Sequence, residues 1–535
     1  MVEQKVYPLG EGSVYYKTIG ENHAETPPRQ HERNDVTNLQ LTIPLSLSAS
    51  PTLDTYTRFS PLDEIMPPIY YGVILAFESQ STDTNSDYVF SILRTGLSKV
   101  AERYPILTSE FARDASNHLV LEQSTSLNEI PLVLKDLTEP GSEPIRAYQE
   151  LKKSGMTGVG ANILAPIVAG IETTSKLMSA QVTFIPGGMF LSMSFTHLLF
   201  DSHSGASIIR LWATLCRELQ QNVTVARIRE KGVKPGDNPV IALAKRLRGN
   251  YEELKGRPEL WEVLGLDWRK SGSTPPEASF TMPLFIPAAA SSPLSPDSSQ
   301  LISTIFSFSR SALASLKIIA TAPTSISSNV EDFQISTHDA LVAFLWRHIL
   351  RARLDPHDKV PYDRESMLAV AVNGRKELSI SECHIGNVIF ESPSSHPIRD
   401  VLSGEASLAQ LAQTIRLNLN KNKKLFPEAL VCASSIPSQA LSSLRYLIDD
   451  FVSQDILTTS WVALPYYSME WGPAFSDNGG YIDFFRWPEG QFPGSNCILP
   501  RKMNGDVEVV LNMKEEQMRR LIADKKFLEM ASLVA

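Results

Sequence analysis

Residues 180–205, with the sequence AQVTFIPGGMFLSMSFTHLLFDSHSG, contain two apolar runs of strand length on either side of the turn residues 186–188. Proline and glycine at this point favour a tight turn, so the stretch predicts a β-hairpin. Side chains alternate along a strand, which puts His197 at the end of an apolar row that starts at Leu191. An imidazole therefore stands at the end of a predicted strand, and Asp201 follows it four residues later.

The spacing of this histidine and aspartate is by itself weak evidence of chemistry. It occurs three times among the ten histidines of the chain: His31 with Asp35, His197 with Asp201, and His396 with Asp400. The first pair lies in a polar stretch, and the third follows ESPSS, a composition typical of a loop. Only the second pair closes an apolar run and precedes small residues that leave room for a substrate. The alternative is that His197 is a buried, hydrogen-bonded histidine without a chemical role.

The chemistry of the imidazole limits the reactions that such a histidine can support. An imidazole titrates near neutral pH and can take a proton from a hydroxyl or an amine that attacks a carbonyl carbon. No serine or cysteine nucleophile is evidently paired with His197, which favours direct transfer over a covalent acyl-enzyme. Ser202 and Ser204 lie so close along the chain that we expect them to form hydrogen bonds in a loop.

The overall composition is that of a folded protein with several domains. The chain has 535 residues, of which 43% are hydrophobic and 20% charged. Its net charge of -9 and the absence of a long Lys/Arg run argue against nucleic acid as a partner. The N-terminal residues lack an apolar segment, and the most apolar long window, 182–200, is interrupted by PGG, so we expect neither a signal peptide nor a membrane span.

The cysteines and the known cofactor motifs narrow the class further. Four cysteines lie far apart without a C-x-x-C spacing, which argues against a disulfide scaffold and a zinc site. A reducing, cytoplasmic location fits this pattern. The chain has no P-loop, dinucleotide-binding, zincin or nucleophile-elbow motif. We therefore expect no metal and no permanently bound cofactor.

Hydrophobic periodicity predicts alternating strands and helices along most of the chain. A helix is expected at 87–105, ended by Pro105, and helical segments at 206–220 and 240–265. Beyond residue 300, the expected elements are a strand and helix in 304–317, a helix in 336–353, a strand in 366–373, and a strand and helix in 505–524. Such alternation is typical of an α/β protein.

The composition also divides the chain into segments. Residues 1–55 are polar, with one short extended piece at 39–47, and we interpret them as an N-terminal extension. The serine- and proline-rich stretch 285–300 is the best candidate for a linker. The prediction is therefore an N-terminal domain at 56–284 and a C-terminal domain at 301–535, which is two α/β halves.

Several segments, taken in order, resemble one enzyme family. HLLFDSHSG is similar to the HxxxD motif of the BAHD acyltransferases, and more closely to that of the fungal trichothecene 3-O-acetyltransferase-like branch. The other matching segments are FSPLDEIMPPIY, LRTGLSKVAERYPIL, FSFSRSALASLK, STHDALVAFLWR, VNGRKELSISECHIGN, TTSWVALPYYSMEWGPAF and GDVEVVLNMKEEQM. The resemblance covers roughly residues 60–530, and it is the ordered set of segments that makes it specific.

The resemblance implies a fold and a reaction. The family fold consists of two similar α/β domains related to chloramphenicol acetyltransferase, with an active-site channel between them. Its members use acyl-CoA as co-substrate and no metal. By this resemblance His197 is the general base that deprotonates the acceptor, and Asp201 of the same catalytic motif points away from the channel and pairs with Arg375. A guanidinium from the other half would satisfy the buried carboxylate and hold the halves in register. The alternative is that Arg375 is a solvated surface charge.

Two further segments of the family are matched less completely. The family's oxyanion donors, a hydroxyl and an indole N–H, correspond to Thr459 and Trp461, although Trp461 in a plain packing role is nearly as good an interpretation. The family's D-F-G-W-G loop is replaced by EWGPA at 470–474, which keeps the acid Glu470 and the glycine Gly472 but loses the final W-G. In the family this loop is structural, so the change bears on loop shape and CoA closure.

Residues for CoA binding are suggested by general electrostatics. A phosphate favours a cation or a helix N-terminus, which makes Ser309, Lys317, Ser336 and Thr337 candidates. All four fit ordinary surface residues equally well.

The leading hypothesis is an acyl-CoA-dependent O-acyltransferase, a cytoplasmic monomer that transfers an acetyl group to a hydroxyl of a small, mostly apolar secondary metabolite. N-acylation of an amine is the nearest rival reaction, because the same base would serve both. Two hypotheses of a different class also stay open: a non-catalytic relative that binds a metabolite or partner, and a condensation or cyclisation enzyme.

Overall fold

The structure of the protein is a computed structural model. It describes residues 8–9, 13–14, 39–42, 57–79, 86–113, 119–123, 130–138, 145–157, 176–221, 238–247, 251–254, 256–267, 301–322, 334–354, 364–441, 444–448, 454–488 and 496–534. The predicted linker at 285–300 and the pair of His31 and Asp35 lie outside the described residues.

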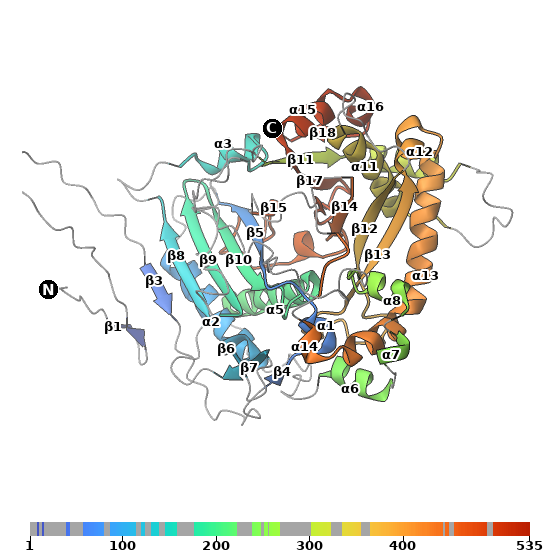
Figure 1. The fold of residues 1–535 in the computed structure, drawn as a ribbon. Coiled ribbons are helices and arrows are strands. Elements are labelled where there is room, and N and C mark those ends of the chain that lie inside the picture. Colours follow the sequence, from blue (N-terminus) through green and yellow to red (C-terminus); the bar gives the residue numbers. More distant parts are fainter. Residues whose placement is uncertain are drawn as a thin grey trace, which may run out of the picture.

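Six strands form the first of two large sheets (Figure 1). In spatial order they are β15 (Phe484–Arg486), β5 (Tyr70–Glu78), β10 (Gly188–Thr196), β9 (Met178–Ile185), β8 (Pro131–Asp136) and β3 (Leu39–Thr42). Strands β9 and β10 are antiparallel neighbours joined at residues 186–187, so the predicted hairpin is confirmed. β3 comes from the region interpreted as an extension and adds an edge strand next to β8.

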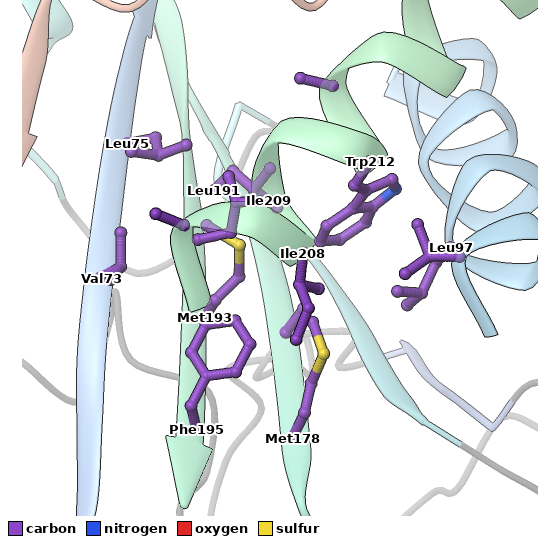
Figure 2. Packing of buried hydrophobic residues seen from close by; sticks show 14 of the residues in the cluster. Val73, Leu75, Leu97, Met178, Leu191, Met193, Phe195, Ile208, Ile209 and Trp212 are labelled. Atoms are coloured by element: carbon purple, nitrogen blue, oxygen red, sulfur yellow. The ribbon is translucent and has the colours of Figure 1, made fainter. Parts of the chain in front are cut away.

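Two long helices cover one face of this sheet. They are α2 (Ser86–Arg103) and α5 (Ser202–Gln220), and α2 confirms the helix predicted from periodicity. Figure 2 shows the apolar row of β10, including Leu191 and Met193, packed under Trp212 of α5. α5 begins four residues earlier than predicted because Asp201 caps it, accepting a hydrogen bond from the backbone N–H of Ser204.

Seven strands form the second sheet, in the order β13, β12, β14, β16, β17, β11, β18. Their bounds are Ile389–Pro397 (β13), Glu365–Asn373 (β12), Ile456–Ser460 (β14), Asn496–Ile498 (β16), Val507–Lys514 (β17), Leu301–Phe308 (β11) and Ser532–Leu533 (β18). β14 runs parallel to both of its neighbours, and the other pairs are antiparallel. The strands predicted in 304–317, 366–373 and 505–524 are present.

The segment around His396 corrects the sequence interpretation. ESPSS was expected to be loop, but residues 391–395 lie inside β13. β13 is an edge strand, where proline is tolerated because one side of the strand makes no ladder hydrogen bonds. Its serines are satisfied by an adjacent helix, as Asn422 donates to the Ser392 hydroxyl at 3.3 Å.

Helices cover one face of the second sheet. They are α10 (Arg310–Ala320), α11 (Thr337–Arg353), α13 (Leu408–Ser435) and α15 (Glu515–Ala523). Three of them match predicted helices, whereas α13, with 28 residues, was not predicted. The helix expected at 240–265 is instead three short helices: α6 (Pro239–Arg246), α7 (Tyr251–Leu254) and α8 (Pro258–Val263). Pro258 is the first residue of α8, a position where the missing N–H breaks no hydrogen bond within the helix.

The remaining elements are short. A small sheet contains β4 (Thr57–Arg58), β7 (Leu119–Gln123) and β6 (Ser109–Arg113), and β1 (Pro8–Leu9) pairs with β2 (Ser13–Val14). The short helices are α1 (Pro61–Glu64), η1 (Pro105–Thr108), α3 (Tyr148–Lys153), α12 (Ile398–Ser403), α14 (Ser438–Leu441), η3 (Tyr466–Ser468) and α16 (Lys525–Leu528). No described helix is long and apolar enough to cross a bilayer.

Late in the sequence, a segment of the second half of the chain joins the first sheet. β15 joins the first sheet beside β5, although residues on both sides of it belong to the second sheet. The segment 461–487 also contributes Trp461, Trp471 and Phe485 to the core of the first sheet. The architecture is the predicted α/β class, with two sheets each covered by helices.

Close packing between α2 and α5 gives a prediction. A Cβ added at Gly96 would lie 2.8 Å from the Cys216 Sγ and 3.1 Å from the Trp212 ring. Gly96→Val should therefore lower the free energy of unfolding by about 1–3 kcal/mol, because a well-packed core has no room for the added atoms. Denaturant titration measures the change. Gly256→Val is the control, because a Cβ there meets nothing within 4 Å; equal losses in the two variants would contradict the packing argument.

Candidate active site

His197 lies just past the end of β10, where it contacts segments from both halves of the chain. Its backbone N–H donates to the Ile69 carbonyl at 2.7 Å, in the first half of the chain. Its carbonyl accepts a hydrogen bond of 2.9 Å from the side-chain amide of Asn387, in the second half. Both halves therefore fix the backbone that carries the imidazole.

Asn387 is in turn held by Asp63, and neither residue was identified from the sequence. The Asp63 carboxylate accepts from the Asn387 backbone N–H at 2.8 Å and from its amide at 2.9 Å. Asp63 also closes a capping box with Ser60 at the start of α1. Burial raises the pKa of Asp63 to about 6, although these hydrogen bonds oppose the shift. The S-P-L-D sequence of a capping box was the signal that could have pointed to Asp63.

The His197 ring has an aromatic neighbour and one buried nitrogen without a hydrogen bond. The Tyr71 ring meets it edge-on, with ring centroids 5.7 Å apart. The ring nitrogen Nδ1 of His197 is fully buried and makes no hydrogen bond to another described residue. Burial lowers the pKa of His197, because a charged imidazolium loses its hydration there. The imidazole is therefore neutral at physiological pH and has a lone pair available for a proton.

Tyr71 also links the histidine to the predicted oxyanion residues. Its ring centroid lies 5.8 Å from that of Trp461, in an edge-to-face contact. Trp461 is buried, and its backbone N–H donates to the Ile498 carbonyl at 2.8 Å. Thr459 precedes it in β14 and is half-buried. Trp461 and His197 thus share Tyr71 as a neighbour, and Thr459 lies two residues upstream of Trp461, near the end of β14.

Asp201 and Arg375 form a bidentate pair. Arg375 donates from Nη1 to Asp201 Oδ2 at 2.8 Å and from Nη2 to Oδ1 at 3.0 Å, and both side chains are fully buried. The Asp201 carboxylate also accepts from the backbone N–H groups of Val388 at 3.0 Å and Ser204 at 2.7 Å. Asp201 therefore faces the second half of the chain, and its oxygens make no hydrogen bond to His197.

The charge state of Asp201 follows from these contacts. Burial alone would raise its pKa, but the Arg375 charge and the hydrogen bonds outweigh it and lower the pKa to about 2. The carboxylate is ionised in the folded protein at any pH above that value. Because the folded pKa is depressed, the resulting stabilisation is present above the unfolded value near 3.8 and is lost as pH falls toward 2.

The serines after the motif have structural roles. Ser204 is fully buried; its hydroxyl donates to the Gly386 carbonyl at 2.9 Å and accepts from Arg375 at 3.0 Å. The Gly386 backbone N–H donates to the same oxygen at 3.1 Å, so the hydroxyl has no proton or lone pair left for attack on a substrate. Ser202 is half-buried and opens α5 as its first residue.

The EWGPA segment at 470–474 forms an ordered turn away from His197. Glu470 pairs with Arg217 of α5 at 3.0 Å, and Trp471 is buried against Trp212, with ring centroids 5.7 Å apart. Gly472 has a φ of +94°, a conformation that favours glycine. The carbonyl of Trp471 accepts from the Gln220 amide at 2.7 Å, which fixes the turn to α5.

The four CoA candidates lie at the starts and surfaces of two helices. Ser309 caps α10 through the Ala312 N–H at 3.1 Å, and Lys317 is exposed in the last turn of that helix. Ser336 caps α11 and is already bonded to Asp339 and Arg416, while Thr337 is half-buried beside it. Among the described residues, no group of three or more His, Cys, Asp or Glu side chains could hold a metal ion.

The buried pair supports a stability prediction. Asp201→Ala leaves the Arg375 guanidinium buried without its counter-charge, so the free energy of unfolding should fall by about 3–5 kcal/mol. Denaturant unfolding followed by circular dichroism measures the loss. The matched control is Glu515→Ala, which breaks an exposed helical pair with Arg519 and should cost less than about 1 kcal/mol. A small, equal effect in both variants would show that the buried pair does not hold the fold.

Comparison with known proteins places these features in a family. The family model described as the Transferase family matches residues 45–528. The eremophilane O-acetyltransferase ORF8 of Penicillium roqueforti is 34% identical over 493 residues, which cover 90% of this chain and 99% of that protein. The eremophilane O-acetyltransferase prx11 of Penicillium rubens is also 34% identical, over 90% and 99% of the two chains.

Solved structures share the fold. The crystal structure of Fusarium sporotrichioides TRI101 complexed with coenzyme A and T-2 matches with a TM-score of 0.69 and 20% identity, over 90% of this chain and 100% of that chain. Vinorine synthase matches with a TM-score of 0.57 and 16% identity, over 92% and 98%. The two-domain, chloramphenicol acetyltransferase-like fold expected from the sequence is thus confirmed. The chain belongs to the Transferase family, the BAHD acyltransferases whose motifs its sequence resembles.

Proposed function

We propose that the protein transfers an acetyl group from acetyl-CoA to a hydroxyl of a small sesquiterpenoid, with His197 as general base. The observation that carries the proposal is the His197 imidazole, whose buried Nδ1 makes no hydrogen bond to another described residue. Its backbone is fixed by both halves, and its neighbour Tyr71 also contacts Trp461. The acetyl group and the eremophilane type of acceptor are suggested by the two relatives at 34% identity, which are eremophilane O-acetyltransferases.

The proposed reaction is direct transfer. His197 removes the proton from the acceptor hydroxyl as its oxygen attacks the thioester carbonyl carbon. The carbonyl oxygen becomes an oxyanion, toward which the Thr459 hydroxyl and the Trp461 indole N–H would donate. When the C–S bond breaks, the CoA thiolate takes the proton from the imidazolium. No acyl-enzyme forms, because the hydroxyl of Ser204 is engaged on both its donor and acceptor sides.

The role of Asp201 in this proposal is to position the histidine. It holds Arg375 and the segment at 386–388, and Asn387 of that segment bonds the His197 carbonyl. Glu470 and Gly472 likewise shape the turn that packs on α5. For CoA phosphates we propose Lys317 with Ser309, and secondarily Ser336 and Thr337, because Asp339 and Arg416 already occupy the Ser336 hydroxyl.

The finer aspects of organisation are also proposals. We propose an extension at 1–55, domains at 56–284 and 301–535, and a linker at 285–300. The four cysteines are free, which supports a reducing compartment such as the cytoplasm. We further propose a monomer that needs no permanent cofactor and binds neither nucleic acid nor membrane, consistent with the net charge of -9.

The activity is tested by following free thiol while the protein is incubated with acetyl-CoA and a panel of eremophilane alcohols. Wild-type protein should release thiol and form the ester, and His197→Ala should lose at least about 10²-fold in kcat with its thermal midpoint unchanged. The matched control is His396→Ala, because His396 has the same spacing to Asp400 and lies 4.0 Å from it on another strand.

Two outcomes would contradict this proposal. If His396→Ala lost as much activity as His197→Ala, the spacing and not the site would be decisive. If only amine substrates released thiol, the protein would be an N-acyltransferase, and if no acyl-CoA did so, it would be a binding protein.

The lowered pKa of His197 predicts a pH profile. The base must be neutral to act, so kcat/KM should rise with pH through the pKa of His197 and be level above it. Because burial lowers this pKa, the midpoint should lie below 6.5, the ordinary value for histidine. Initial rates between pH 4.5 and 8 measure it. A midpoint clearly above 6.5 would show that another group is the base.

A further inference from the structure

The second sheet has an inner face that turns away from its covering helices. On β12, Leu368 and Val370 point into the core under α11 and α13, so Ala369 and Ala371 point to the inner face. On β17 and β16, the inner-face residues Val510 and Cys497 pack against the core of the first sheet. The inner face is therefore the side that the first half of the molecule covers.

One acid lies on this inner face in line with Thr459. Ala371 of β12 is directly opposite Glu391 of β13, so the two share the inner face. On the other side of β12, Val370 pairs with Thr458 in parallel register, which puts the next residues, Ala371 and Thr459, side by side. Thr459, Ala371 and Glu391 thus form a row across three strands. Since strands are about 4.8 Å apart, the ends of the row are roughly 10 Å apart.

The Glu391 carboxyl has no partner. It makes neither a hydrogen bond nor an ion pair with another described residue, and its Oε2 is fully buried. Burial raises its pKa to about 8. Its Cγ packs against Gly265, where an added Cβ would approach to 2.9 Å. The carboxyl is therefore mostly protonated at neutral pH and carries an unused O–H donor.

Three other buried acids among the described residues have ion-pair partners. Asp201 is held by Arg375, Asp339 accepts from Arg416 at 2.5 Å, and Glu508 pairs with Arg486 at 2.7 Å. A buried polar group without a hydrogen bond destabilises a fold, so its presence calls for a function. The middle residue of the row, Ala371, carries only a methyl group beside Glu391.

We propose that Glu391 binds the acceptor, its carboxyl O–H donating a hydrogen bond to a second oxygen of the acceptor, remote from the hydroxyl that is acylated. This inference rests on the proposed function. It narrows the acceptor class to alcohols that carry a carbonyl, ether or epoxide oxygen at the other end of a compact skeleton. The length of the row from Thr459 to Glu391 sets the distance between the two oxygens of the acceptor, because Thr459 marks the reacting end.

The first test measures stability and does not depend on substrate. An acid kept for binding should cost stability, so Glu391→Leu and Glu391→Gln should each raise the thermal midpoint, by about 2 °C or more for the leucine variant. The control is Glu365→Leu, an exposed acid on the neighbouring strand β12, which should leave it unchanged. A lower midpoint in Glu391→Leu than in wild type would show a structural role and overturn the proposal.

The second test measures recognition with two probes, an eremophilane alcohol that carries a ring ketone and the same alcohol with the ketone reduced to a methylene group. Glu391→Leu should raise KM for the keto-alcohol roughly tenfold, a factor equal to about 1.4 kcal/mol, with no change for the methylene compound. Glu391→Gln, which keeps a donor, should stay within about threefold of wild type. CoA affinity, measured by calorimetry, should be the same in all variants.

The two proposals fail in distinguishable ways. If wild-type protein transfers no acetyl group to either probe, the proposed function fails. If wild-type protein transfers it and Glu391→Leu shows the same KM values as wild type for both probes, the transferase assignment stands and the role of Glu391 is overturned.

Discussion

The rest of the site depends on one buried ion pair, between Asp201 and Arg375. Four donors converge on this single carboxylate: two from Arg375, and the backbone N–H groups of Ser204 and Val388. A carboxylate has about four acceptor positions, so all of them are used. Because Ser204 lies in the first turn of α5 and Val388 precedes β13, the one group fixes a helix of the first half against a strand of the second. Without it, the segment at 386–388 would lose its anchor and His197 its support through Asn387.

This saturation separates the two residues of the HxxxD motif. In hydrolases with a Ser-His-Asp triad, the acid bonds the imidazole and stabilises its charged form. Here the acid has no free acceptor position, and no carboxylate of the part of the chain that the structure describes bonds the His197 ring. Burial is then the dominant influence on the imidazole, and it favours the neutral form. In the proposed reaction, such an imidazole would hold the proton only briefly, between removal from a hydroxyl and return to a leaving thiolate.

Periodicity predicted the hairpin β9–β10 and the helices α2 and α11, because their apolar residues follow a single face. It failed where long-range contacts decide the structure. ESPSS forms a strand because β12 and α13 lie beside it, and β15 joins the first sheet although it is only three residues long. Local pattern singled out His197 and Asp201, and family resemblance supplied their expected roles and the partner Arg375. The capping-box sequence could have pointed to Asp63, but Asn387 and Glu391 were not predictable, since only the folded chain shows which polar side chains are bonded and which are left alone.

The exchange of β15 has a consequence for how such an enzyme can evolve. A protein made of two similar halves invites the idea that each half is a module that could be recombined with another partner. Here the first sheet takes its β15 edge strand from a segment late in the chain, and Trp471 from the same region fills its core. If the chain were cut between the halves, the first sheet would lose β15. The edge of β5 would then be exposed as a template for aggregation. We therefore expect such a chain to diverge by point substitutions in both halves, and the two halves to be inherited together as one unit.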